Sequence, residues 1–217
     1  MFTKAHIEAF LLNPYVDKMF AFVAMLPTIT SLYVFVVAAL KSQIDLYAFG
    51  IAFWGLFIVV PMLTRRTATR VSLRPWDWFI TAGRTYWPFA MYYTLDVTHS
   101  VPLVPFVVSN TVFWVSILFM IYARYDLGRS IGLVPAHRGL VTTGVYGWMR
   151  HPIHTAQVVF YIAHSMRYFS LWNMLIIGTG IAFVFAKTLV EERFLKEDEE
   201  YREYCKKVPW RWVPWIA

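Results

Sequence analysis

The residue types best suited to chemistry gather in the stretch GVYGWMRHPIH, residues 144–154. Arg150, His151 and Pro152 stand together at the start of an apolar run, and His154 follows His151 by three positions. Because proline fits the first turn of a helix, Arg150 and His151 should lie beside the free amide groups and the positive dipole end of that helix. Such a place favours a bound carboxylate or phosphate. The alternative is an arginine that only marks the inner face of a membrane.

A second group of ionisable residues follows the last apolar run. Glu191 and Glu192 are adjacent there, and Lys187 lies four positions before Glu191. Residues four apart meet on a helix, so Lys187 and Glu191 can form an ion pair. A lysine one turn inside an apolar span costs free energy unless it is paired or faces a polar cavity. The alternative is a lysine that reaches the membrane surface and pairs at the helix end.

A metal site is a weaker hypothesis. The chain has six histidines and a single His-x-x-His spacing, from His151 to His154. Membrane di-iron enzymes have several His-rich boxes, so we expect no metal here.

The elements that position these residues lie in a membrane. Of the 217 residues, 59% are hydrophobic and 19% are aromatic, which is more apolar than an ordinary soluble domain. The net charge of +7 is distributed between apolar spans, so we expect an anionic lipid surface as partner and no nucleic acid. The only cysteine, Cys205, excludes an internal disulfide.

The apolar segments predict an all-α, polytopic membrane bundle of about five to six transmembrane helices. The predicted spans are 19–40, 46–63, 76–95, 101–122, 153–168 and 171–190. Residues 5–12 predict a short interfacial helix, and 153–168 with 171–190 predict a helical hairpin. With all six spans crossing and both termini cytoplasmic, most of the 20 Lys and Arg lie on the cytoplasmic side. Whether 76–95 crosses or re-enters stays open, because it contains Asp77, Gly83, Arg84 and Pro88.

This layout divides the chain into an N-terminal transmembrane scaffold, 1–122, and a catalytic region, 123–217. The second region contains a cytoplasmic loop, the hairpin and the C-terminal tail. Gly139 and Gly144 in the loop allow backbone amides to approach a ligand closely. We therefore expect a water-soluble cofactor to bind within 123–217.

Four elements in order resemble the isoprenylcysteine carboxyl methyltransferase family, which is similar to the phospholipid N-methyltransferases. They are RGLVTTGVYGWMRHPIH, an apolar hairpin, EERFL and YREYCKKVPWRWVP, and they cover about residues 126–217. The resemblance implies S-adenosylmethionine at the cytoplasmic mouth of the hairpin and a lipid-like or prenylated acceptor from the bilayer. By position, the cofactor would contact Arg138, Gly139, Leu140, Val141, Tyr146, Arg150, His151, Pro152, His154 and Glu191.

The resemblance also assigns catalytic roles. Lys187 stands where the prenylcysteine enzymes use an arginine near the acceptor. His154 stands where the family usually has tyrosine, and Arg138 where prenylcysteine enzymes show histidine. A carboxylate acceptor needs no general base, whereas an ammonium head group must lose a proton, with His154 or Glu192 as candidate bases. The acceptor stays open among a prenylcysteine, an amino-phospholipid, another isoprenoid and a small hydrophobic thiol, as does the oligomeric state.

Two alternatives remain. Sterol reductases, which use NADPH, have a similar C-terminal half, but they carry an Asp-rich, Cys-containing stretch after the last helix. Here that stretch is Glu191-Glu192-Arg193-Phe194-Leu195. The third hypothesis is a membrane scaffold without enzymatic activity.

Overall fold

The computed structural model describes residues 3–40, 49–50, 53, 64–87, 90 and 100–215. The longer helices are α2 (Pro14–Leu40), α6 (Phe106–Leu127), α7 (Pro152–Arg167) and α8 (Leu171–Leu195). The shorter helices are α1 (Lys4–Leu11), α4 (Pro75–Tyr86) and α9 (Glu199–Lys207), with the 3-10 turns η2 (Gly128–Ser130) and η3 (Gly144–Gly147). Strands β1 (Arg70–Val71) and β2 (Ala136–His137) pair antiparallel, with Arg70 opposite His137. The prediction of a predominantly helical fold is confirmed.

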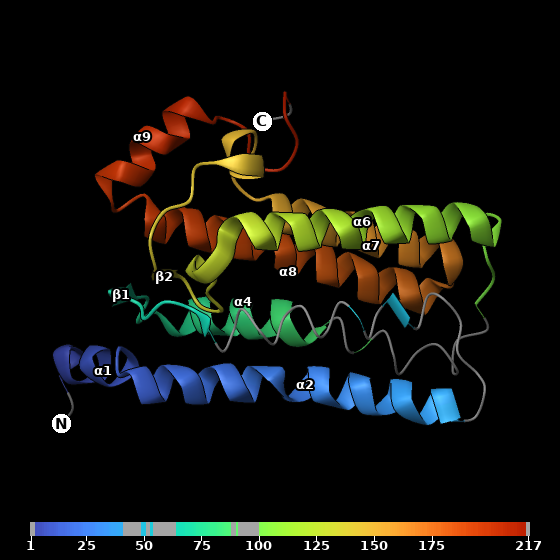
Figure 1. Ribbon diagram of the computed structural model, residues 1–217, viewed down its shortest axis with the longest axis horizontal. Coiled ribbons are helices and arrows are strands. Elements are labelled where there is room, and N and C mark those ends of the chain that lie inside the picture. Colours follow the sequence, from blue (N-terminus) through green and yellow to red (C-terminus); the bar gives the residue numbers. More distant parts are fainter. Residues whose placement is uncertain are drawn as a thin grey trace.

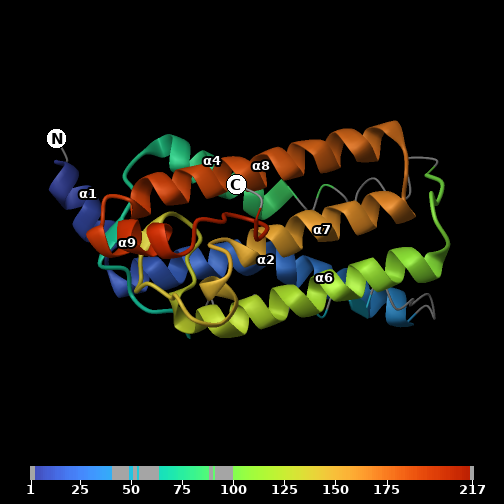
Figure 2. The same ribbon diagram turned by 90° about the horizontal axis from the view of Figure 1, so that it is seen from above.

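The long helices run along the long axis of the molecule (Figure 1). Helices α6, α7 and α8 lie side by side, as Figure 2 shows from above, and α7 packs against both of its neighbours. Helix α4 packs against α8, and α2 runs along the bottom of the molecule in the view of Figure 1. Helix α9, the loop between α6 and α7, and the β1–β2 pair gather at one end of the bundle (Figure 1).

Local sequence signals explain where these helices begin. Pro152 and Pro75 occupy the first turns of α7 and α4, where a missing amide proton costs nothing. Ser170 caps α8 by accepting a hydrogen bond from the amide of Asn173 at 3.2 Å. Only residues 168–170 separate α7 from α8, so the two helices are consecutive and pack together. Their interface with α6 buries Phe113, Phe160 and Val184, among others.

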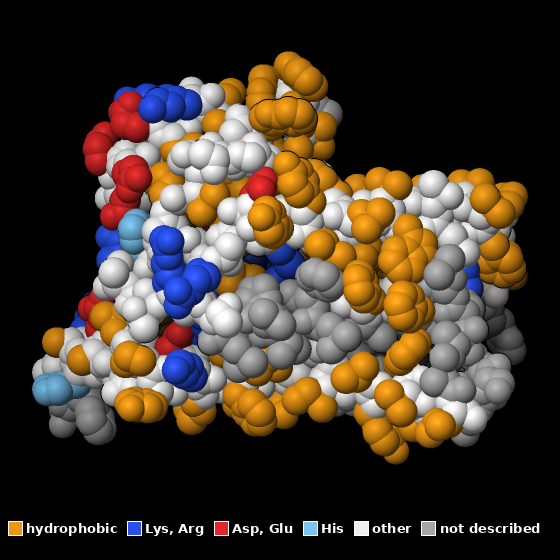
Figure 3. Space-filling view, viewed as in Figure 1, with side chains coloured by type: hydrophobic (Ala, Val, Ile, Leu, Met, Phe, Trp, Pro, Cys, Tyr) orange, Lys and Arg blue, Asp and Glu red, His pale blue; other side chains and the backbone are white. Residues whose placement is uncertain are grey.

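The surface of the bundle is apolar along its length. Figure 3 shows hydrophobic side chains over α2 and α6, whereas most charged side chains gather at the end with α9 and β1. Within the described residues, two helical segments, Phe106–Ser130 and Leu171–Leu195, are long and apolar enough to cross a membrane. Lys4–Leu11 with Pro14–Leu26, bent by 67°, gives a third if it forms one broken span. These features indicate an integral membrane protein.

The number of crossings and the side of each terminus stay predictions. The predicted span 46–63 lies almost entirely outside the described residues, as does most of 76–95 beyond α4. The predicted interfacial helix, 5–12, corresponds closely to α1. Helix α8 continues one turn beyond the predicted end at residue 190, which keeps Glu191 and Glu192 on regular helix.

An ion-pair centre ties α2 to the rest of the fold. Asp17, in the first turn of α2, accepts hydrogen bonds from Arg65 and Arg138, each with a nitrogen 2.7 Å from Oδ1. Both arginine side chains are almost fully buried. One carboxylate therefore fixes the loop between α6 and α7 against the N-terminal helices.

Candidate functional site

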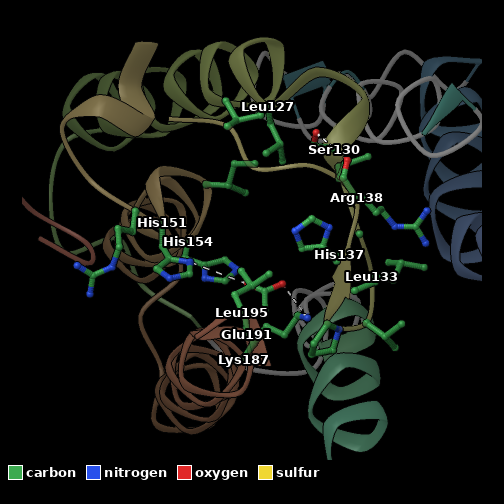
Figure 4. A pocket seen from close by; sticks show the side chains of 18 of the residues that line it. Leu127, Ser130, Leu133, His137, Arg138, His151, His154, Lys187, Glu191 and Leu195 are labelled. Carbon is green, nitrogen blue, oxygen red and sulfur yellow. Dashed lines mark hydrogen bonds and ion pairs between the residues drawn. The ribbon is translucent and has the colours of Figure 1, made fainter. Parts of the chain in front are cut away.

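A cavity of about 200 Å³ lies at the end of the bundle that carries the loop and α9. Helices α4, α6, α7 and α8 contribute to its walls, together with residues 130–141 and two tyrosines of α9 (Figure 4). Most of the predicted site residues line it: Arg138, Gly139, Leu140, Val141, Tyr146, Arg150, His151, His154, Lys187 and Glu191. Pro152 and Glu192 do not. Helices α2 and α4 supply a further wall that the sequence analysis did not anticipate.

One wall carries a compact polar group, which we call the cavity cluster: His151, His154, Lys187 and Glu191. Lys187 Nζ lies 2.8 Å from Glu191 Oε1, as the four-residue spacing predicted. Glu191 Oε2 lies 3.9 Å from His151 Nδ1 and 3.8 Å from His154 Nε2. The two imidazole rings are nearly parallel, with centroids 5.3 Å apart. Figure 4 shows all four side chains together beside the open space.

Hydrogen bonds to Thr188 define the tautomer of His154. The Thr188 hydroxyl donates to the Val184 carbonyl at 3.1 Å and accepts from Trp212 Nε1 at 3.2 Å. His154 Nδ1 lies 2.8 Å from the same oxygen, whose single proton is already donated. With the Thr188 proton on the Val184 carbonyl, His154 Nδ1 donates to Thr188 and Nε2 is the unprotonated nitrogen of the neutral ring. That nitrogen points toward Glu191.

Behind the cavity wall lies a second charged group, which we call the clamp: Arg150, Glu192, Lys196 and Arg211. Glu192 Oε1 accepts from Arg150 Nε at 2.8 Å, and Oε2 accepts from Arg211 Nε at 3.1 Å. Lys196 Nζ lies 3.1 Å from the same Oε2. Arg150 also donates to the Val208 carbonyl at 2.6 Å. Glu192 is thus fully used inside the protein, which argues for a structural role.

The C-terminal tail occupies amides that the sequence analysis left free for a ligand. The amide of Arg150 donates to the Trp210 carbonyl at 2.9 Å, and the amide of His151 donates to the Arg211 carbonyl at 2.8 Å. The Thr155 hydroxyl donates to the Trp212 carbonyl at 2.5 Å. The tail therefore covers the start of α7, and side chains rather than these two amides face the cavity.

Arg138 lines the cavity, but its guanidinium points away from it toward Asp17 (Figure 4). The adjacent Gly139 has φ +93°, a conformation that favours glycine. A Cβ at Gly139 would lie 2.9 Å from Arg66 Nη1, so a side chain would also crowd this turn. Leu140 packs against the α9 tyrosines, and Val141 packs against Tyr146.

Three tyrosines form the wall toward α9. The Tyr204 hydroxyl donates to the Tyr146 carbonyl at 2.7 Å, while the buried Tyr201 hydroxyl has no hydrogen-bond partner within the described residues. Burial raises the pKa of Tyr146, Tyr201 and Tyr204 above the ordinary value. All three hydroxyls therefore stay protonated at neutral pH, and Tyr201 is free to donate to a ligand.

Sequence reasoning missed two cavity residues, Arg84 on α4 and Arg124 on α6. Arg124 is 6% exposed, and its Nε and Nη1 have no hydrogen-bond partner in the described part of the chain; the same holds for Arg84 Nε. The rule that a charge within an apolar segment is functional would have marked Arg84. Gln157 on α7, whose buried Oε1 also lacks a partner among these residues, carried no such signal.

His151, His154 and Glu191 could also hold a metal ion, because their ligand atoms lie within 4.8 Å of one another. The same groups could serve a zwitterionic organic cofactor, since a carboxylate and imidazoles recognise ammonium and carboxylate groups. The expectation of a metal-free site stays a prediction.

Comparison with known proteins finds a family match for part of the chain. Residues 104–202 match the family model described as phospholipid methyltransferase. No curated protein matches the chain significantly. The matched segment contains α6, α7, α8, the intervening loop and the start of α9.

Proposed function

Because the chain carries a phospholipid methyltransferase domain over residues 104–202, which implies a membrane methyltransferase, we propose that it transfers a methyl group from S-adenosylmethionine to a lipid-like acceptor. The acceptor carries an amine or a carboxylate. The resemblance of the loop and tail to isoprenylcysteine carboxyl methyltransferases keeps a prenylated acceptor in the proposal.

One observation carries this proposal. The matched segment supplies the whole cavity cluster, with Glu191 facing His151 and His154 across distances below 4 Å. A methyl donor with an ammonium, a carboxylate and ribose hydroxyls needs such a mixture of acid and imidazole. Residues 191–195, which follow the last apolar run, do not form the Asp-rich, Cys-containing stretch of the reductases. We therefore prefer methyl transfer to reduction.

The residues present fit S-adenosylmethionine. Glu191 would hold the ammonium group or the ribose hydroxyls, and His151 the carboxylate. The unpartnered Tyr201 hydroxyl offers a further donor. Leu140, Val141 and Leu195 offer an apolar surface for the adenine. The turn at Gly139 would bring the backbone close to the cofactor.

When bound, S-adenosylmethionine would supply a methyl group attached to a positively charged sulfur. The acceptor's nucleophile would attack the methyl carbon in line, and the sulfur would leave as a neutral thioether. The residues of the cavity chiefly align the acceptor and exclude water. For an amine acceptor, His154 Nε2 accepts the proton that the ammonium must lose, while Nδ1 stays bonded to Thr188. Lys187 Nζ holds an anionic part of the acceptor. Glu192, the other candidate base, does not line the cavity and would act by positioning Arg150.

The proposal is tested by adding labelled S-adenosylmethionine and a total lipid extract to the purified protein in non-ionic detergent. Mass analysis then identifies which lipid gains a methyl group. Titration with S-adenosylmethionine and, separately, NADPH measures which cofactor binds. We expect saturable binding of the first only, and transfer that EDTA does not abolish.

Matched variants locate the donor. His151→Ala should weaken donor binding by about 10- to 150-fold, because it removes a charge-assisted hydrogen bond. His6→Ala, an exposed histidine of α1, is the control and should leave it unchanged. Equal donor affinities in both variants would remove His151 from the donor site, and saturable NADPH binding would contradict the proposed reaction.

A further inference from the structure

The charges of the cavity do not balance. Arg138 is paired with Asp17, Arg150 with Glu192, and Lys187 with Glu191. Arg84 and Arg124 also line the cavity, and no carboxylate among the described residues forms an ion pair with either. Glu200 of α9 lines the cavity too, but it is exposed, so the wall between α4 and α6 carries two arginines without a paired carboxylate among the described residues.

An arginine without a paired carboxylate is costly in a buried place. Arg124 is 6% exposed, and two of its three nitrogens have no hydrogen-bond partner within the described residues. Arg84 is close enough to Arg124 and to Lys187 to repel both. A buried charge without a partner loses several kcal/mol of hydration free energy, and no ion pair compensates for this loss. The buried Arg124, with the partly buried Arg84 beside it, therefore indicates a ligand that brings negative charge.

The position of Arg84 indicates which ligand that is. Helix α4 packs against the part of α8 that lies before Lys187, since Trp87 Nε1 donates to the Ile176 carbonyl at 2.7 Å. Gly83 lies directly against the ring of Phe183. Arg84 thus reaches the cavity from α4, deeper along the apolar helices than the loop, and it lies near enough to Glu191 to be attracted by that carboxylate. We therefore expect a hydrocarbon-bearing acceptor to reach the cavity along these apolar helices.

We propose that Arg84 and Arg124 form an oxyanion-binding site that holds the phosphate or carboxylate of the lipid acceptor. Each guanidinium can donate two parallel hydrogen bonds to such a group. The site draws on α4, which precedes the matched methyltransferase domain. The N-terminal region therefore selects the acceptor as well as supporting the fold.

This inference rests on the proposed function only in naming the anion as part of the acceptor, so the experiment measures binding without methyl transfer. The purified protein in non-ionic detergent is titrated with monododecyl phosphate, with laurate, with uncharged dodecanol and with inorganic phosphate. The variants are Arg84→Met and Arg124→Met. Arg74→Met, which removes an exposed arginine just before α4, is the matched control.

We expect one of the two dodecyl anions to bind more tightly than dodecanol and than inorganic phosphate. Arg84→Met and Arg124→Met should each weaken that binding by about 10- to 150-fold. Arg74→Met should leave it unchanged, and the affinity for S-adenosylmethionine should change by less than about twofold in all variants. Since Arg124→Met removes an unpaired buried charge, the melting temperature of this variant should not fall.

Three outcomes overturn the inference. Unchanged binding of both dodecyl anions in the cavity variants removes the arginines from the site. A loss of S-adenosylmethionine affinity instead assigns the arginines to the donor's carboxylate, and tighter binding of inorganic phosphate assigns them to a free anion. If a methionine variant unfolds, Arg84→Lys keeps the charge but not the fork, so it should bind the dodecyl anion more weakly than the wild type and more tightly than dodecanol. Binding no tighter than that of dodecanol rejects the site. Wild-type protein that binds a dodecyl anion but no S-adenosylmethionine would reject only the proposed function.

Discussion

Glu191 and Glu192 are adjacent on α8, yet they belong to different kinds of charged group. In the clamp, Glu192 contacts Arg150, Lys196 and Arg211, and both of its oxygens accept hydrogen bonds. Its Oε1 also lies 3.3 Å from His151 Nε2, so His151 borders both groups. In the cavity cluster, Glu191 makes one close contact, to Lys187, and faces two imidazoles at longer range. The comparison separates a saturated ion-pair network, which holds the fold, from an incompletely paired one, which can accept a ligand.

The largest effect should come from breaking the clamp. Glu192→Gln leaves Arg150 and Arg211 without their shared carboxylate, and removing one partner of a buried ion pair costs about 3–5 kcal/mol. We expect this loss in the free energy of unfolding, measured by denaturant titration in detergent. Glu203→Gln removes an exposed acid that pairs with Lys206 and should cost less than about 1 kcal/mol. Equal stability of the two variants would contradict a structural clamp.

The cavity cluster should respond in the opposite way. The double variant Lys187→Met, Glu191→Gln removes the ion pair as a unit, and such replacements are often close to neutral for stability. We expect the free energy of unfolding to change by less than about 1 kcal/mol, while donor affinity falls about 10- to 150-fold. Isothermal titration with S-adenosylmethionine measures this. A large loss of stability with donor binding intact would place Glu191 with the clamp.

Lys187→Met alone tests the role of Lys187 separately from that of Glu191. Removal of one point charge near the acceptor should raise the acceptor KM by about tenfold, whereas donor affinity should stay nearly unchanged. Lys187→Arg retains the charge and should keep KM near the wild-type value. Steady-state kinetics with the lipid found to be methylated would test both. A wild-type KM in Lys187→Met would show that this amine does not contact the acceptor.

A smaller effect is expected from the tyrosine wall. Tyr204→Phe removes the hydrogen bond to the Tyr146 carbonyl, 2.7 Å in the wild type, and should cost about 0.5–1.5 kcal/mol of unfolding free energy. Tyr15→Phe, an exposed tyrosine at the start of α2, should be neutral. A neutral Tyr204→Phe would mean that solvent satisfies this carbonyl equally well.

The smallest effect concerns the single cysteine beside the clamp. Burial raises the pKa of the Cys205 thiol above its usual value, so less thiolate is present at pH 8 than in an unfolded chain. Alkylation by iodoacetamide should therefore be slower in the folded protein, and its rate should continue to rise at more alkaline pH. Mass analysis over a pH series measures this, with denatured protein as the reference. Equal rates in both states would contradict the burial of the thiol.

Local sequence signals were sufficient for one of the two charged groups. The spacing of Lys187 and Glu191 predicts their ion pair, and Pro152 predicts the start of α7, because both depend only on helix geometry. The apolar runs predicted the two long helical segments that could cross a membrane for the same reason. The resemblance to membrane methyltransferases is confirmed by the family match over residues 104–202, which includes the loop and the hairpin.

The clamp could not be predicted, because its members lie far apart in the sequence. Arg150 precedes Glu192 by 42 residues, and no local pattern shows which of two adjacent acids will face it. Chemistry alone therefore gave Glu192 a catalytic role, although it does not line the cavity. Arg84 was also missed as a site residue, since its meaning depends on α4 packing against α8. The roles of Glu192 and Arg84 depend on long-range packing, which local patterns in a single sequence do not reveal.

The two arginines on Asp17 have a consequence for how the chain is assembled during synthesis. Arg65 follows Asp17 by 48 residues, and Arg138 follows it by 121. A ribosome therefore completes α2 well before either partner exists, and Arg65 arrives first. The second contact forms only after α6 has been made. The order of translation thus sets the order in which the two ion pairs of Asp17 can form. The loop over the cavity can contact the N-terminal helices only after these helices have been made.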